Sequence, residues 1–525
     1  MSTSMRFDAV SLEIAWKRLI SIVDQMAVTL KRTSFSPLVR EGNDFSCLLL
    51  GADASSAVQS SMSAPSFLGT LPYTVEQMLE RVPKNTLAPG DVLITNDPWI
   101  GTGHLLDISV ATPIFLGPQL IGFLANAAHV PDVGGIGFSA TGSDVLEEGL
   151  LIPVSRLYRG GVRNEDVVNF IRANVRVPDM VLGDVEAQVA ANHAAGRLLV
   201  EFLSESGLDL AELIAALQER SEHALRAAIK AVPDGVYRAE ITGDGYDEPV
   251  TLRCQIRVSG DTLEVDYAGS SMESPRGINS VLNYTQGYTI YGLKCVLDPN
   301  TPSNAGCLRP VRISAPEGSI LNPRWPAPTL SRHVVGNLLP SLVFAALAPV
   351  RSDQVQADAG SSPIWPVRFD GLDDDGGPFT LTLQFSGGQG ARASKDGMAA
   401  VSFPANASNT PVEVIESVAP LCVIEKSLIQ DSGGAGRYRG GHGQRVVIRS
   451  HASRPFRVSV LAGRLRHPAI GLMGGQPGRP GAIFIDGQRQ FTTSAMVLPP
   501  GGDLVLELPG GGGWGAPEER EASRA

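Results

Sequence analysis

Residues 104–132 read HLLDISVATPIFLGPQLIGFLANAAHVPD, two apolar runs separated by the four residues LGPQ. Two such runs joined by a short segment with Gly and Pro are typical of a β-hairpin. Directly opposed residues of an antiparallel hairpin have a constant sum of residue numbers. A three-residue loop, GPQ, gives a sum of 236 and places Asp107 opposite His129. A two-residue loop, GP, places Asp107 opposite Ala128 instead, and the pattern leaves both open.

Histidine and aspartate recur with the same spacing at the two ends of this predicted hairpin. His104 and Asp107 form His-Leu-Leu-Asp, and His129 and Asp132 form His-Val-Pro-Asp, with the two histidines 25 positions apart. Opposed residues have Cβ atoms roughly 4.5–5.5 Å apart, so Asp107 and His129 can reach one shared ion. Imidazole and carboxylate ligands suit zinc, manganese and iron without choosing among them. The alternative, that both histidines are ordinary hydrogen-bonded loop residues, stays open at this point.

The rest of the chain reads as a mixed α/β region followed by a β-rich region. The expected elements of the first region are a helix over 7–33, a strand over 45–51, a helix over 75–82, a strand over 91–97 and a helical stretch over 181–232. After Pro233, short strands alternate with Gly and Asp turns around a helical patch over 333–349. We therefore predict an α+β fold, with a mixed α/β region and its metal-binding hairpin in residues 1–232 and a β-rich region in residues 233–525.

The composition describes a globular protein that is not built to bind nucleic acid or to cross a membrane. Hydrophobic residues make up 43% and charged residues 18% of the 525 residues, enough apolar material for a core. The formal net charge of -11 disfavours phosphate contacts, and no stretch reaches the roughly 18 apolar residues of a membrane span. The five cysteines form no CxxC pair, and the first residues carry acids and lack a long apolar run. Both features indicate a cytoplasmic protein.

Several short motifs resemble those of the hydantoinase B/oxoprolinase family. Residues 96–107, NDPWIGTGHLLD, are similar to the family pattern NDPYxGGTHLPD, and residues 128–135, AHVPDVGG, are similar to AHHxDVGG. Further matches follow in the family's order: EEGLLIP at 147–153, NAGC at 304–307, NTPVE at 409–413 and LPGGGGWG at 508–515. The resemblance covers nearly the whole chain, and its specificity comes from the number and the order of the motifs.

The resemblance implies a divalent metal, zinc, manganese or iron, held by His104, Asp107, His129 and an aspartate of an early Asp-Phe-Ser segment. That segment stands here as Asp44-Phe45-Ser46, so the fourth ligand is expected at Asp44, although the preceding VREG departs from the family's usual wording. Asp132, which we count with His104, Asp107 and His129 among the catalytic candidates, and Asp97 are expected to orient the ligands. Asp97 has a second interpretation, as a turn former before Pro98.

Two further segments allow two interpretations each. Arg332 and His333, in SRHVVGN, either line a pocket or begin a helix. The terminal GGGGWG is either a flexible tail or, as the resemblance implies, a loop that approaches the site.

The resemblance also implies an activity and a partner. Family members of this type open small cyclic amides, such as hydantoin, oxoproline or a lactam, in an ATP-dependent reaction with a hydantoinase A-like partner that holds the ATP. This chain has no GxxxxGK[ST] phosphate loop, which agrees with ATP binding elsewhere. Two alternatives remain: a subunit of an ATP-dependent ketone carboxylase, and a non-catalytic scaffold stabilised by a metal. The sequence does not name the cyclic amide or ketone, the metal, the number of ions or the size of the hetero-oligomer.

The acidic charge balance generates a first prediction. Tight binding to nucleic acid depends on clustered Lys and Arg, which this chain lacks. We expect the purified chain to give no mobility shift with DNA or RNA at physiological salt. Tight binding that weakens as salt is raised would contradict this expectation.

Overall fold

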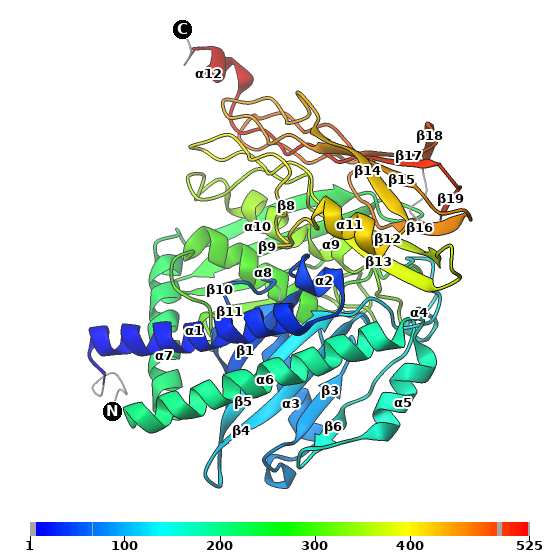
Figure 1. Cartoon of the computed structure of the whole chain (residues 1–525). Helices are drawn as coiled ribbons and strands as arrows, with labels where there is room; N and C mark the ends of the chain where they lie inside the picture. The colour runs from blue at the N-terminus through cyan, green and yellow to red at the C-terminus, as the bar shows by residue number, and fades with distance from the viewer. Residues whose placement is uncertain (1–6, 66, 491–495, 523–525) are drawn as a thin grey trace.

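A seven-stranded sheet in the order β2-β1-β5-β4-β3-β6-β7 is the centre of the N-terminal part of the molecule (Figure 1). The structure is a computed structural model that describes residues 7–65, 67–490 and 496–522. The strands of this sheet are β1 (Phe45–Gly51), β2 (Ser56–Gln59), β3 (Val92–Thr95), β4 (Asp107–Leu116), β5 (Gln119–His129), β6 (Ser155–Arg159) and β7 (Val162–Arg163). Antiparallel strands, helices on the sheet and three further sheets confirm the predicted α+β class.

Helices cover both faces of this sheet, which explains why β1 is apolar apart from Ser46. Successive side chains of a strand point to opposite faces, and all seven residues of β1 are buried. Phe45, Cys47 and Leu49 pack against α1 (Ala9–Thr33), α6 (Pro178–Ser206) and α7 (Leu210–Lys230). Leu48 and Leu50 pack on the other face against α3 (Phe67–Arg81). The predicted helices over 7–33, 75–82 and 181–232 are therefore present, α3 beginning earlier than expected.

In the hairpin of β4 and β5, Asp107 pairs with His129 because of a β-bulge and not because of a three-residue loop. The turn is the two-residue GP, because Leu116 pairs with Gln119, so the three-residue loop is wrong. A β-bulge beyond the turn, where Ile121 has no partner, then shifts the register by one residue. Asp107 consequently lies opposite His129, as the longer loop predicted.

Buried amides fix this hairpin against α6. Gln188 donates to the carbonyl of Ile108 at 2.7 Å and to Asn126 Oδ1 at 2.8 Å, and Asn126 in turn donates to Asn192 Oδ1 at 2.7 Å. All three amide side chains are fully buried. Because a buried amide left without a partner is costly, this network opposes any slip of the strands beneath α6. Although α6 is 29 residues long, no helix within the described ranges is long and apolar enough to cross a membrane.

The middle of the chain forms a second sheet and a group of buried helices. The sheet has the order β11-β10-β9-β8, from β8 (Gly235–Gly243), β9 (Val250–Ser259), β10 (Thr262–Asp266) and β11 (Val311–Ser314). The expected helical patch is present as α9 (His333–Gly336) and α10 (Leu339–Leu347), whereas the sequence did not predict α8 (Leu282–Leu297). Twelve of the 16 residues of α8 are buried, so it has no exposed polar face to mark it as a helix. The largest apolar cluster contains residues from both sides of Pro233, including Val232 and Ile241.

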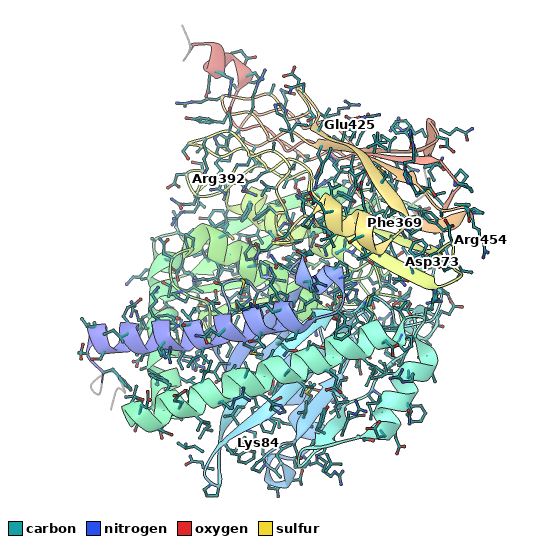
Figure 2. All side chains as sticks on the ribbon, viewed as in Figure 1. Lys84, Phe369, Asp373, Arg392, Glu425 and Arg454 are labelled. Carbon is teal, nitrogen blue, oxygen red and sulfur yellow. The ribbon has the colours of Figure 1, made fainter. Side chains whose placement is uncertain are left out.

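The C-terminal part contains two packed antiparallel sheets. One has β12 (Trp365–Leu372), β13 (Pro378–Phe385), β16 (Phe456–Val460) and β19 (Met496–Leu498), and the other β14 (Leu421–Leu428), β15 (Gln444–Ser450), β17 (Ala482–Ile485), β18 (Gln488–Gln490) and β20 (Asp503–Glu507). Figure 2 shows Phe369 and Glu425 in this part and Lys84 at the opposite end of the molecule. The remaining helices are α2 (Pro37–Arg40), α4 (Val145–Glu148), α5 (Glu165–Asn174), α11 (Val412–Val418), α12 (Pro517–Ala522) and the 3-10 turns Lys84–Thr86 and Ala305–Cys307.

The terminal GGGGWG lies inside a set of extended segments, so its interpretation as a flexible tail is wrong. Backbone hydrogen bonds join these segments: Gly434 N donates to Gly511 O at 2.8 Å, and Gly512 N donates to Asp358 O at 2.8 Å. Residues 509–515 are all buried. The backbones approach so closely that a Cβ on Gly511 would overlap the carbonyl oxygen of Gln389. Glycine is required there by the close approach.

This close packing generates a stability prediction. Gly511→Ala forces a methyl group against backbone that cannot move aside, and overpacking of this kind costs on the order of 3 kcal/mol. We expect a thermal unfolding midpoint several degrees below that of the unmodified chain. Gly69→Ala in α3 is the matched control, since its Cβ would lie 3.5 Å from Gly287 Cα, an ordinary contact. Equal midpoints for the two variants would contradict the account of the glycine-rich segments.

Candidate metal centre

Three neighbouring strands of the seven-stranded sheet place Asp44, His129 and Asp107 in a row, at the end that these strands share. Asp107 is the first residue of β4 and pairs with His129, the last residue of β5. On the other side of β5, the backbone N–H of His129 donates to the carbonyl of Asp44 at 3.1 Å, just before β1 begins. Residues opposed across antiparallel strands project from the same face. The register of the sheet therefore brings residues from two distant motifs together.

His104 reaches the same place from the loop between β3 and β4. Asn96 fixes this loop, because its Nδ2 donates to the carbonyls of Leu105 at 2.8 Å and Leu150 at 2.9 Å, while its Oδ1 accepts from Ile152 N at 2.6 Å. The family resemblance gave a ligand-orienting role to Asp97 in this loop and none to its neighbour Asn96, which makes these three hydrogen bonds. Asp97 accepts a hydrogen bond from Trp99 N at 3.0 Å, as a turn former does.

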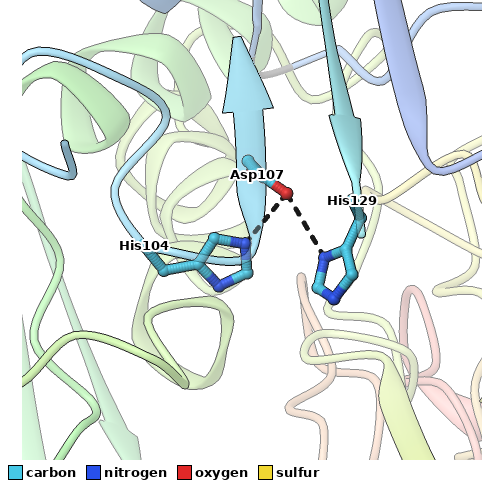
Figure 3. Close-up of side chains that lie close together, drawn as sticks. All are labelled: His104, Asp107 and His129. Atoms are coloured by element: carbon cyan, nitrogen blue, oxygen red, sulfur yellow. Dashed lines mark ion pairs between the residues drawn. The ribbon is translucent and has the colours of Figure 1, made fainter. Parts of the chain in front are cut away.

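The three side chains converge on one oxygen atom (Figure 3). Asp107 Oδ1 lies 2.9 Å from His104 Nε2 and 3.3 Å from His129 Nδ1. One potential ligand atom from each residue lies within 4.8 Å of the others, and all three residues are tightly enclosed. Among the described residues this is the group of His, Cys, Asp and Glu side chains whose geometry can hold a metal ion.

The protonation of His104 shows why this cluster suits a cation. Its Nδ1 lies 2.9 Å from the carbonyl of Leu330, which only accepts, so Nδ1 carries the proton. Burial and the nearby Arg332 lower the pKa of His104 to about 4, so the ring is neutral at pH 7. Nε2 then turns a lone pair toward Asp107 Oδ1, and neither atom has a hydrogen-bond partner. Two electron-pair donors held this close attract a cation, and an imidazole nitrogen beside a carboxylate oxygen fits a metal ion.

Asp107 stays ionised because positive charge and donors surround its second oxygen. Arg332 Nη2 and Thr102 Oγ1 both lie 2.6 Å from Oδ2. Burial pushes the pKa of Asp107 upward, but His104, which is protonated in the acid range where Asp107 titrates, and Arg332 outweigh burial and hold the pKa well below its ordinary value. Arg332 is fixed by stacking on Tyr284, 4.1 Å from the ring centre, and by donating to the carbonyl of Thr102. The carboxylate is thus kept available as an anionic ligand.

Asp44 lies beside this cluster, with its Oδ2 3.6 Å from His129 Nδ1. Gln384, from β13, donates to the same oxygen at 2.7 Å. Burial raises the pKa of Asp44 above its ordinary value. Asp44 is therefore placed to join the three residues, at the outer end of the row.

Asp132 does not lie with the histidines and instead holds two arginines. Its Oδ1 accepts from Arg176 Nη1 at 2.8 Å and from Arg368 Nη2 at 3.1 Å, and its Oδ2 accepts from the backbone N–H of Arg176. The side chain is fully buried. Asp132 thereby ties the segment after β5 to the C-terminal β12, three residues beyond His129.

A cavity opens onto the cluster between the N-terminal sheet and the sheet of β12 and β13. His104, His129 and Asp44 line it with Arg332 and His333, so the pocket interpretation of SRHVVGN is confirmed, and α9 also begins at His333. Burial and Arg332 lower the pKa of His333 to about 3, so this ring too is uncharged at neutral pH. The other lining residues are apolar or uncharged: Asn43, Ala64, Phe67, Phe138, Tyr284, Tyr288, Leu330, Asn337, Ile364, Pro366, Thr382, Gln384, Ala405 and Ala407. An aromatic and polar lining of this kind suits a small uncharged molecule.

Known proteins resemble this chain over nearly its whole length. A protein described as the B component of a D-/L-hydantoinase, from a Pseudomonas species, is 33% identical over 99% of this chain and 92% of its own length. The crystal structure of ATP-dependent caprolactamase from Pseudomonas jessenii has a TM-score of 0.89 at 26% identity, covering 99% of this chain and 93% of that one. Nucleotide-free acetone carboxylase has a TM-score of 0.88 at 21% identity, over 100% and 78%, and shares the fold. The family model for hydantoinase B/oxoprolinase matches residues 8–517, and the chain belongs to this family.

Proposed function

We propose that the chain is the metal-binding subunit of an ATP-dependent enzyme that opens a small cyclic amide. The observation that carries this proposal is the convergence of His104, Asp107 and His129 on one buried point at the wall of a cavity whose lining is mostly apolar or uncharged. The relatives point the same way, since they are named as the B component of a hydantoinase and as an ATP-dependent caprolactamase.

In this proposal His104, Asp107 and His129 hold a divalent zinc, manganese or iron ion, and Asp44 is a fourth ligand. The bound ion would polarise a carbonyl oxygen or lower the pKa of a water molecule. Arg332 keeps Asp107 ionised, and the carbonyl of Leu330 keeps the Nε2 of His104 free of a proton. Asp132 acts as a positioning residue, because both of its oxygens are taken by Arg176 and Arg368.

We further propose that the ATP is held by a separate, hydantoinase A-like subunit. The relatives that are named as components of larger enzymes support a partner, and the sequence contains no GxxxxGK[ST] loop. Carboxylation of a ketone remains the second candidate reaction. The shared fold of acetone carboxylase is compatible with it, and no side chain of the cavity favours it over ring opening. The third candidate is a scaffold whose metal only stabilises the assembly.

Substitution of the ligands generates a metal prediction. The unmodified chain should hold about one tightly bound divalent ion, because two imidazoles and one or two carboxylates leave a position open for water or substrate. His104→Ala, Asp107→Ala and His129→Ala should lose the ion and the activity together while the circular dichroism spectrum stays unchanged. Elemental analysis of the purified variants measures the loss. His223→Ala, on the exposed face of α7, is the control that should retain both. Full metal content in the His104 and His129 variants would mean that the site is misassigned.

A weaker effect is expected from Asp132. Asp132→Ala removes the carboxylate that Arg176 and Arg368 share but leaves the three ligand side chains in place. Loss of a group that only orients ligands typically costs about 10–100-fold in metal affinity or activity. Competition titration with a metal chelator measures the affinity. Complete loss of metal would instead place Asp132 among the ligands.

The partner requirement and the reaction type can be tested together. The chain alone should show no ATP-dependent ring opening, and activity should appear when a hydantoinase A-like subunit is added. ATP hydrolysis coupled to ring opening by this chain alone would contradict the two-subunit proposal. If turnover depends on bicarbonate, the reaction is carboxylation and not ring opening. If turnover survives substitution of the metal ligands, the chain is a scaffold.

A further inference from the structure

Glu148 is a buried carboxyl group that holds the backbone behind the metal centre. It is the last residue of α4 and is fully enclosed. Its Oε1 accepts hydrogen bonds from the backbone N–H groups of Thr329 and Leu330, both at 2.8 Å. A Cβ on Gly277 would lie only 2.8 Å from the same oxygen, so the glycine leaves the space that the carboxyl group needs.

The segment that Glu148 holds makes both of the contacts that prepare the ligands. The carbonyl of Leu330 accepts the Nδ1 proton of His104 at 2.9 Å. Two residues later, Arg332 contacts Asp107 Oδ2 at 2.6 Å. One short stretch of backbone therefore sets the proton position of the histidine and the charge of the aspartate.

The position of Glu148 is costly for stability. No arginine, lysine or histidine forms an ion pair with it in the part of the chain that the structure describes, and burial raises its pKa to about 8 despite the hydrogen bonds from Leu330 and Thr329. A buried carboxyl group without a cationic partner is unfavourable, and a neutral amide of the same shape would accept the same hydrogen bonds. The hydrogen-bonding acceptor, and not its charge, is what the backbone of Thr329 and Leu330 requires.

We propose that Glu148 is a positioning residue of the metal centre: it fixes the peptide of Thr329 and Leu330 so that His104 keeps Nδ1 protonated and presents Nε2 to the ion. The inference rests on the proposed metal centre. Without an acceptor at position 148, two buried N–H groups lose their partner, the segment moves toward another acceptor, and the carbonyl of Leu330 no longer fixes the ring of His104.

The test is titration of the metal-free full chain with Co²⁺, whose visible absorption reports both binding and ligand geometry. Glu148→Gln keeps the acceptor and should keep the dissociation constant within about threefold and the absorption spectrum unchanged. Glu148→Leu removes the acceptor and should raise the dissociation constant about 10–100-fold, with an altered spectrum.

A matched control separates positioning from loss of stability. Asp244 also accepts hydrogen bonds from consecutive backbone N–H groups, those of Leu465, Arg466 and His467 at 2.5, 3.1 and 2.8 Å, but it does not line the metal cavity. Asp244→Leu should lower the thermal midpoint and leave Co²⁺ binding unchanged. If Glu148→Leu does not fold, Glu148→Asp replaces it, because its shorter side chain withdraws the carboxylate from both N–H groups.

The outcomes distinguish this inference from the proposed function. If Glu148→Leu, or Glu148→Asp in its place, binds Co²⁺ as tightly as the unmodified chain does, the positioning role is overturned. The proposed metal centre would still stand. Equal weakening by Glu148→Gln and Glu148→Leu would show that charge rather than the acceptor matters, and would also overturn it. An unmodified chain that binds no Co²⁺ through His104 would overturn both proposals.

Discussion

The antiparallel register of β1, β5 and β4 is the constraint on which the site depends. Asp107 faces His129 across one pair of strands, and His129 bonds to the backbone of Asp44 across the next. Because side chains alternate along a strand, a slip of one residue would turn one member of the row to the opposite face. The bulge at Ile121 sets the β4–β5 register, and the amide network of Gln188 and Asn126 beneath α6 holds it.

Few charged groups surround the buried cluster of His104, Asp107 and His129. Asp107 receives one guanidinium and one hydroxyl on its second oxygen, which leaves Oδ1 turned toward the two histidines. Burial and the same Arg332 lower the pKa of His104, which keeps its ring neutral. Arg332 thus favours both the ionised form of Asp107 and the uncharged form of His104. Leu330 and Arg332 reach the proposed ligands from the middle of the chain, whereas Asn96 and Thr102 come from the same first quarter as the ligands.

The sequence predicted the fold class and the N-terminal helices, because these follow from local periodicity, and it gave the pairing of Asp107 with His129 as one of two registers of the hairpin. It did not predict α8, whose buried surface lacks the polar face that marks most helices. It also did not predict the bulge, so the right pairing came with the wrong turn. Arg332 was expected either to line a pocket or to begin a helix, without its contact to Asp107, and the roles of Gln384 and Glu148 were not foreseen. These residues act from more than a hundred positions away or through backbone contacts, and such contacts leave no local pattern. The sequence also did not predict the packing of the terminal glycines, because the segments that they contact are distant in the chain.

The most direct test of the proposed metal centre is anomalous diffraction from crystals of the active holoenzyme, recorded at the absorption edge of the metal found by elemental analysis. We predict an anomalous peak bounded by His104 Nε2, Asp107 Oδ1 and His129 Nδ1, with Asp44 beside it. An active holoenzyme whose metal lies elsewhere in this chain or only in its partner, with the His104 and Asp107 side chains still in contact, would contradict it.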